Sequence, residues 1–252
     1  MPTADDFQAL ARSSPWRFRA LHFRHRDHER EVEAWLHRPG HLVVRRQGHD
    51  DVVSTGVPYS RGWVTIGPGK VSQPVPVHPH DAVPELRPDG LVARRPDDLA
   101  IEWDDPIYGD YQWVALLDPV ELSHHVAVDD VVESDRAGRP TWWARVAARP
   151  GYEPRCDCCA LLWSQISDAD RRVVSEPTVD LDVDVEYPDD YTVGLDVQTG
   201  IVVALRPSGG PSRWPRQWCE VDVLAVDGEV GDPPPERRPD HRPRPTTGRT
   251  ES

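Results

Sequence analysis

The stretch YTVGLDVQTGIVVALR, residues 191–206, indicates the fold class of this chain. Its two runs of alternating or β-branched apolar residues, 191–197 and 201–206, flank a short turn, QTG, at 198–200. Two such runs joined by a tight turn predict a β-hairpin. Strands joined in this way pair antiparallel.

The rest of the chain repeats this pattern on both sides of the hairpin. The other strand-like runs are 16–26, 31–37, 41–46, 51–54, 62–66, 126–135, 140–149, 178–186 and 218–226. A shift in the apolar phase within the first of these runs predicts a β-bulge. Many strands joined by short hairpins, with few helices, predict a mainly β (α+β) fold. We expect a single curved antiparallel sheet or an open half-barrel.

Three short segments carry helical signals: 3–13, 113–123 and 167–174. The first has a capping threonine and two aspartates at its positive end, and we expect Pro15 to end it. The second is ambiguous, because Pro119 would have to start a second turn rather than lie inside a helix.

The chain is predicted to hold one β-rich domain, residues 1–230, followed by a tail. Within the domain, 67–98 is proline-rich, which favours a long surface loop or lid. Residues 231–252 are rich in proline and arginine and have no hydrophobic pattern, so we expect them to be disordered.

The charge of the chain excludes two classes of partner. With 29 basic and 43 acidic residues the net charge is −14, which argues against a general nucleic-acid or anionic-membrane binder. The stretch 12–46 is basic, with nine arginines and four acidic residues. Either these early strands neighbour acidic later strands, or they form a basic face for an anionic partner.

The sequence predicts a cytoplasmic location. Its N-terminus lacks the basic and apolar regions of a secretory signal, and no stretch reaches the roughly 18 apolar residues of a membrane helix. In a reducing compartment, cysteines are more often thiols or ligands than structural disulfides.

Four cysteines are the weak candidates for a metal site: Cys156, Cys158, Cys159 and Cys219. Their spacing is not that of paired zinc knuckles, and redox or incidental thiols are the alternatives. If the chain is extended there, Cys156 and Cys158 share a face. We therefore predict no four-ligand metal site, with at most two thiols converging, and no cofactor.

The sequence shows no catalytic motif. His78 and His80 lie in the proline-rich segment without recognisable partner ligands, and the acidic run at 180–184 fails the pattern of a calcium loop. Carboxylates such as those at 102–105 are common in an acidic protein. The chain is therefore not expected to be an enzyme.

The aromatic composition is more informative, with ten tryptophans and three phenylalanines. Trp142 and Trp143 are consecutive on a predicted strand and should point to opposite faces. With Trp35 they are the candidate ligand-binding residues. The alternatives are an apolar cavity lined by these rings or ordinary core packing.

Three segments carry a resemblance to a known family: WRFRALHFRHRDHEREVEAWLHRPGHLVVRR at 16–46, YQWVALLDPVEL at 111–122 and YPDDYTVGLDVQTGIVVALRP at 187–207. They resemble the opening strands, the mid-chain helical stretch and the late hairpin of the LolA-like and RseB-like superfamily of bacterial lipoprotein carriers. The resemblance covers about residues 10–228 in outline. It implies a half-barrel whose concave face is closed by helices over a hydrophobic cavity.

The same resemblance implies non-catalytic binding of acyl chains or sensing of lipid-modified proteins. Those carriers are exported, whereas this sequence shows no signal peptide. Only the fold and a general capacity for apolar ligands therefore carry over.

Three hypotheses follow. The leading one is a non-enzymatic binding or sensing module with a cavity for a hydrophobic small molecule or lipid. The alternatives are a protein-interaction or scaffold component without a small ligand, and a metal-dependent hydrolase. The first requires an apolar cavity of roughly several hundred Å³, and the second expects a filled interior.

Overall fold

The computed structural model describes residues 1–56, 64–65, 71–72, 77–98, 100–156, 159–174, 186–210 and 218–231. The strand predicted at 178–186, apart from its last residue, and the tail beyond residue 231 lie outside this description. So do Cys158 and parts of the predicted strand at 62–66 and of the proline-rich segment.

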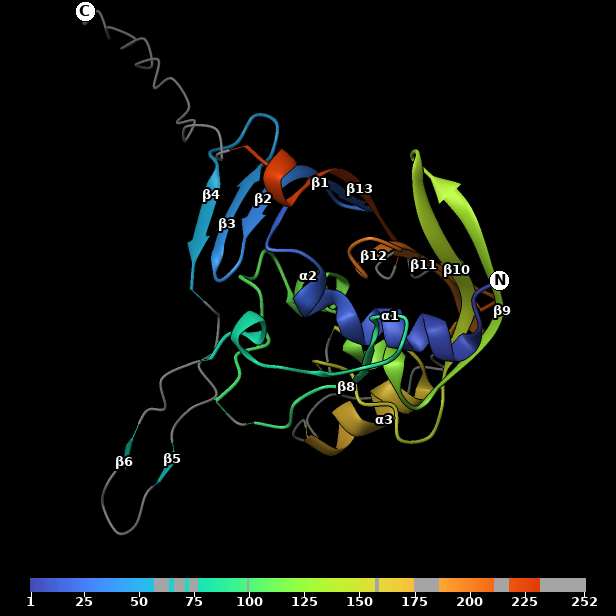
Figure 1. The fold of residues 1–252 in the computed structure, drawn as a ribbon. Helices are drawn as coiled ribbons and strands as arrows, with labels where there is room; N and C mark the ends of the chain where they lie inside the picture. The colour runs from blue at the N-terminus through green and yellow to red at the C-terminus, as the bar shows by residue number, and fades with distance from the viewer. Residues whose placement is uncertain are drawn as a thin grey trace, which may run out of the picture.

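One sheet dominates the fold, in the strand order β4-β3-β2-β1-β13-β12-β11-β10-β9. Its strands are β1 (Ala20–Asp27), β2 (Glu31–His37), β3 (His41–Arg45), β4 (Val52–Thr55), β9 (Val126–Arg136), β10 (Arg139–Ala148), β11 (Asp190–Asp196), β12 (Val202–Ser208) and β13 (Cys219–Val226). Neighbouring strands pair antiparallel, and the sheet curves without closing into a barrel (Figure 1). The predicted mainly β class with a single curved sheet is confirmed.

Two small ribbons lie outside this sheet: β5 (Val64–Thr65) with β6 (Val71–Ser72), and β7 (Glu85–Leu86) with β8 (Val92–Arg94). The predicted bulge is present, because the register between β1 and β13 shifts at His22/Phe23.

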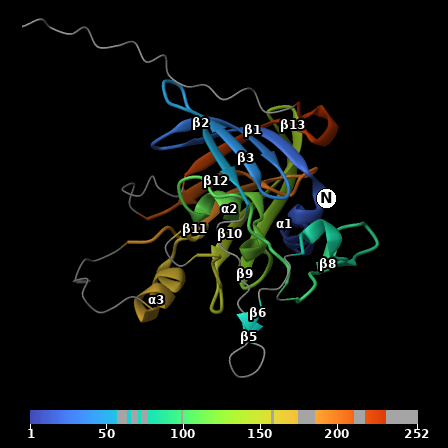
Figure 2. The ribbon, with the colours of Figure 1, turned by 90° about the vertical axis from the view of Figure 1, so that its left-hand side faces the viewer.

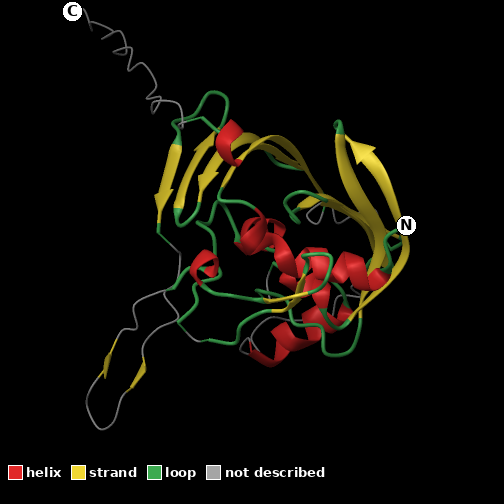
Figure 3. Ribbon diagram, viewed as in Figure 1, coloured by secondary structure: helices red, strands yellow, loops and turns green. Residues whose placement is uncertain are grey.

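The helices in the described part of the chain are few: α1 (Ala4–Arg17), α2 (Tyr111–Leu117), α3 (Gln165–Val174) and the 3₁₀ turns η1 (Pro79–Asp81), η2 (Val120–Ser123) and η4 (Asp227–Glu229). Of these, α1 and α2 lie on the concave side of the sheet (Figure 3). Pro119 separates α2 from η2, as predicted. None of the described helices is long and apolar enough to cross a membrane.

The prediction that Pro15 ends the first helix is wrong, since α1 continues to Arg17. The carbonyl groups of its last turns receive side-chain donors from distant parts of the chain. Arg38 Nη1 donates to the Ser14 carbonyl at 3.0 Å, and Arg95 Nε donates to the Arg12 carbonyl at 2.9 Å. Arginines at a helix C-terminus stabilise it in this way.

The core consists of two clusters on the concave side. α1 packs Phe7 and Leu10 against strands β10–β12, and α2 packs Trp113 and Leu117 against β1–β3 and β13. The two core clusters meet where β12 lies beside β13. These two strands, both fully described, are paired through two residue pairs. Figure 2 shows α1 and α2 below strands β1–β3 of the curved sheet. These helices occupy the concave side of the sheet.

The described part of the proline-rich segment, residues 77–98, lies along α1. Trp16 Nε1 donates to the Ala82 carbonyl at 3.0 Å, and Arg12 Nε donates to the Val92 carbonyl at 2.7 Å. Arg87 forms ion pairs with two aspartates in the first turn of the helix. This part of the segment is tied to the domain by specific side chains.

Replacing Gly200 should test how closely α1 seats on the sheet. Gly200 has φ +73°, and an added Cβ would lie 2.8 Å from the Leu10 carbonyl oxygen. Gly138 has φ +77° with open space around it. Both alanine variants should lose roughly 1–2 kcal/mol from the left-handed backbone. We expect Gly200→Ala to lose about 1–3 kcal/mol more by urea unfolding, because α1 must shift. Equal losses would contradict this packing.

His25 should make stability depend on pH. It is 3% exposed and lies beside Trp113, and burial lowers its pKa to about 4. Between pH 6.5 and pH 4 the unfolded chain therefore binds a proton that the folded chain does not. We expect the free energy of unfolding to fall by up to about 3 kcal/mol as pH is lowered through this range. His25→Leu should remove this contribution, whereas the exposed-site control His49→Leu should retain it.

Candidate functional site

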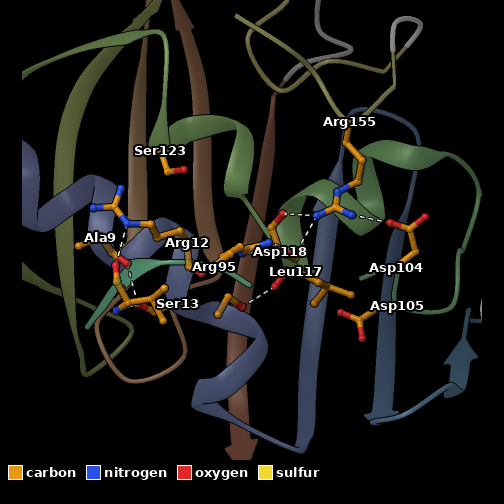
Figure 4. Close-up of polar contacts among 12 residues, drawn as sticks. Ala9, Arg12, Ser13, Arg95, Asp104, Asp105, Leu117, Asp118, Ser123 and Arg155 are labelled. Atoms are coloured by element: carbon orange, nitrogen blue, oxygen red, sulfur yellow. Dashed lines mark hydrogen bonds and ion pairs between the residues drawn. The ribbon is translucent and has the colours of Figure 1, made fainter. Parts of the chain in front are cut away.

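The greatest concentration of buried charge lies where α2 ends. Asp118 is fully buried and accepts hydrogen bonds from Arg95 Nη1 at 3.0 Å and Arg155 Nη2 at 2.5 Å. Arg155 also pairs with Asp104 (Figure 4). Nearby, Arg38 and Asp105 form a two-bond pair at 2.9 and 2.7 Å.

The electrostatics of this network keep its members charged. Burial alone would raise the pKa of Asp118, but Arg95 and Arg155 outweigh it and hold that pKa below its ordinary value. Burial likewise works against the charge of Arg155, yet Asp118 and Asp104 raise its pKa. Each of these carboxylates is engaged by an arginine, so the arrangement binds parts of the chain together and has no acid or base poised for a substrate.

Glu121, one turn further on, is the second buried carboxylate of this region. It accepts hydrogen bonds from the Tyr152 hydroxyl at 2.6 Å, the Arg155 amide at 2.8 Å and the Leu161 amide at 2.7 Å. Burial raises the pKa of Glu121, while these hydrogen bonds act in the opposite direction. Glu121 thus joins Tyr152, Arg155 and Leu161 through one buried carboxylate.

The structure brings the histidines of the proline-rich segment close to acidic residues. His78, His80 and Glu102 line a hollow of about 20 Å³ together with Asp104 and Asp105. A space of this size holds about one water molecule. Burial and the nearby Arg38 lower the pKa of His80. Among the described residues, no group of three or more histidine, cysteine or acidic side chains is arranged to hold a metal ion.

Trp35 lies on the convex face of the sheet, because its neighbours Ala34 and Leu36 belong to the concave core. Trp35 is 8% exposed, and its ring lies between the His22 ring, stacked at 4.6 Å, and the Arg45 guanidinium at 5.4 Å. The ring is therefore covered by the protein's own side chains.

Trp142 and Trp143 lie on opposite faces, as predicted. Trp142 packs against the α1 core and its Nε1 donates to Glu133 at 2.9 Å. Trp143 lies against Gly194, where an added Cβ would be 3.1 Å from the ring, and Arg206 lies 5.7 Å from its centre. The three candidate tryptophans thus do not line one common cavity.

Two kinds of cysteine are present in the described part of the chain. Cys219 is fully buried in β13, and burial raises the pKa of its thiol far above the ordinary value. Cys156 and Cys159 are partly exposed and belong to one turn, in which the Cys159 amide donates to the Cys156 carbonyl at 3.1 Å. The expectation that Cys156 and Cys158 share a face of an extended chain lies outside the described residues, because Cys158 is not among them.

The space inside the curve of the sheet is small. The apolar void between the sheet and α2, lined by Phe23, His25 and Trp113 among others, measures about 10 Å³. A hollow of about 400 Å³ is found instead at the surface, beside the loop that joins β3 to β4. Packing by α1 and α2 accounts for the filled interior.

Strand β4 forms one edge of the sheet, and its outer side has no partner strand among the described residues. The Gly56 amide donates to the Gly40 carbonyl of the neighbouring chain segment at 2.6 Å, so the backbone groups of Gly56 face β3. In an antiparallel pair, residues alternate between facing the partner strand and facing away from it. The backbone groups of Val53 and Thr55 therefore face outward, away from β3. Val52 and Val53 are 45% and 47% exposed. No charged residue or proline lies within Val52–Thr55.

The opposite edge, β9, is different. It carries acidic side chains at four of its eleven positions, and Asp130 has φ +55° at an irregularity in the pairing with β10. Bulges and charged side chains of this kind discourage the addition of another strand. The sequence predicted both strands, but it did not predict that β4 would be an edge, because its order in the sheet depends on distant strands.

The surface hollow adjoins the beginning of β4. Within it, Arg45 is paired with Asp51 at 2.7 Å. Arg46 and His49 also line the hollow and have no ion-pair partner in the described part of the chain. The hollow therefore offers two basic side chains next to an open strand edge.

Comparison with known proteins gives no family for the chain. No family model matches it, and no curated protein matches it. The function must be inferred from the geometry described above.

Replacing Asp118 should measure how much the fold depends on the buried network. Asp118→Ala leaves Arg95 and Arg155 without their shared carboxylate, so we expect a loss of about 3–5 kcal/mol in the free energy of unfolding. The control is Asp5→Ala, which removes an exposed partner of Arg87 and should have a much smaller effect. Urea denaturation monitored by tryptophan fluorescence measures both. Similar losses in the two variants would contradict the importance of the network.

Proposed function

We propose that the protein is a non-enzymatic interaction module that binds an extended polypeptide segment of a partner along β4. The observation that carries this proposal is the edge of β4, which has no partner strand among the described residues. It has two exposed valines, and the backbone groups of Val53 and Thr55 face outward. Such an edge is a template for an additional strand, with main-chain hydrogen bonds providing affinity and side chains providing specificity.

The chemistry of the edge indicates the kind of segment that fits. The valines favour β-branched or other apolar residues in the added strand. At the β3–β4 loop, Arg46 and His49 favour an acidic group at the corresponding end of the segment. The partner is thus an extended, apolar segment with a carboxylate at one end.

The filled interior supports a protein partner more than an apolar ligand. A lipid-like molecule requires an enclosed volume far larger than the void of about 10 Å³ between the sheet and α2. Membership of the LolA-like and RseB-like superfamily remains a proposal. It is supported by the curved antiparallel sheet with helices on its concave side.

The test uses proline to block the edge without disturbing the fold. The Val53 amide faces away from β3, so Val53→Pro removes an outward donor and no hydrogen bond of the sheet. The control is Asp135→Pro on β9. Asp135 is opposite Pro140 of β10. The Pro140 carbonyl accepts from the Val197 amide on the other side of β10, so it faces away from β9. The pair is therefore one without mutual hydrogen bonds, and the Asp135 amide faces outward.

A partner recovered from cell extract with the full chain would be purified and its affinity measured for each variant. We expect Val53→Pro to weaken binding at least about tenfold, which corresponds to 1.4 kcal/mol, with Asp135→Pro unchanged. Fatty-acid titration should leave tryptophan fluorescence unchanged. A partner that binds Val53→Pro as tightly as the wild type, or saturable quenching by fatty acid, would overturn the proposal.

A further inference from the structure

The loop that joins β3 to β4, residues 46–51, holds two basic side chains close together beside the strand edge. Its first four residues form a turn, in which the His49 amide donates to the Arg46 carbonyl at 3.2 Å. Gly48, the third residue of this turn, has φ +79°, which is the conformation that a type II β-turn requires at that position. The end residues of a β-turn lie within about 7 Å of each other between their Cα atoms, so Arg46 and His49 are neighbours.

The hollow of about 400 Å³ beside this loop has an excess of basic groups. Each of the three acidic side chains that line it lies next to a basic group of the protein. These pairs are Glu31 with Arg24 at 3.7 Å, Glu33 with His22 at 2.8 Å and Asp51 with Arg45 at 2.7 Å. Arg46 and His49 have no such partner in the part of the chain that the structure describes. Their hydrogen-bond donors are therefore available to an anion.

The position of this charge gives an added strand its direction. The loop precedes Val52, the first residue of β4, so Arg46 and His49 lie at the end of the ladder where β4 begins. A strand that adds antiparallel to β4 places its carboxyl end there, and a parallel strand would place its amino end there. Because a guanidinium group attracts a carboxylate and repels an ammonium group, the loop favours the antiparallel strand.

A main-chain carboxylate reaches this loop more directly than an acidic side chain does. Successive side chains of a β-strand point to opposite faces of the sheet, across the direction in which the chain runs. Arg46 and His49 lie instead along that direction, beyond the start of β4. An internal segment would have to carry its next peptide groups past the turn, whereas a chain that ends there places its terminal oxygens beside the two basic side chains.

We propose that the edge of β4 recognises the C-terminus of its partner, which adds as an antiparallel strand and places its free carboxylate between Arg46 and His49. This inference rests on the proposed function and adds the end of the partner that is bound and its direction. A guanidinium group donates two parallel hydrogen bonds to a carboxylate, and a histidine N–H donates a further one. Because the turn is formed before binding, little ordering of the protein opposes the interaction.

The first test compares two peptide libraries that differ in which end is free. Short random peptides would be displayed on phage, either ending in a free carboxylate or joined to the coat protein at the carboxyl end, and selected on the full-length chain. We expect the first library to yield peptides that no longer bind Val53→Pro. Such peptides from the second library alone would leave edge binding in place and overturn the inference. None from either library would overturn both.

The second test measures the contribution of the carboxylate. The best peptide with a free C-terminus would be synthesised as the acid and as the amide, and fluorescence anisotropy would give both dissociation constants. We expect amidation to weaken binding to the wild type at least about tenfold, because charge-assisted hydrogen bonds are lost. In the double variant Arg46→Gln, His49→Gln, amidation should change the affinity by less than about threefold.

The matched control is Arg149→Gln, which removes an exposed arginine from the segment after β10 and should retain the full effect of amidation. Equal affinities of the acid and the amide for the wild type would overturn the inference. Edge binding would still stand in that case if Val53→Pro abolished both interactions.

The direction of the strand has a separate readout by NMR. A nitroxide label at the amino end of the bound peptide should broaden the amide signal of Thr55 more than that of His49, because an antiparallel strand begins beside the end of β4. The reverse pattern would show a parallel strand and overturn the inference.

Discussion

The ion pairs of Asp118 with Arg95 and Arg155 hold separate parts of the chain in their positions relative to one another. A carboxylate placed where α2 ends, with no exposed surface, is tolerable only because two guanidinium groups surround it. Those arginines come from the segment along α1 and from the loop before α3. The same guanidinium groups also donate to backbone carbonyls, Arg95 to Arg12 in the last turns of α1 and Arg155 to Asp118 at the end of α2. One buried charge thereby orders four separate parts of the chain.

That network explains how a curved sheet acquires a filled concave side. The strands supply an apolar surface, but a helix that ends inside a protein leaves carbonyl groups without donors. Arg38 and Arg95 satisfy such groups at the end of α1, which allows the helix to lie deep against the sheet. With α1 and α2 seated in this way, the available recognition surfaces are at the edges and on the convex face.

Local signals in the sequence were enough for most of the fold. The hairpins at 126–149 and 191–206 and the break at Pro119 follow from alternation, turn residues and proline chemistry within a few positions. The end of α1 could not be predicted, since its donors lie at residues 38 and 95. The site was harder still: carboxylates at 104 and 105 read as background in an acidic chain, and only folding reveals which arginines meet them. Trp35 was a reasonable candidate by type, yet strand alternation turned it away from the concave side.

The interlocked charges also constrain how the chain can diverge. An apolar replacement of Asp118 alone leaves the buried Arg95 and Arg155 without their shared carboxylate. Loss of Arg155 alone removes the arginine that pairs with Asp104 and one of the two arginines that pair with Asp118. Each single step on the way to an uncharged interior passes through an unstable intermediate, although the fully apolar end point need not be unstable. We therefore expect Arg95, Asp104, Asp118 and Arg155 to be kept together or replaced together.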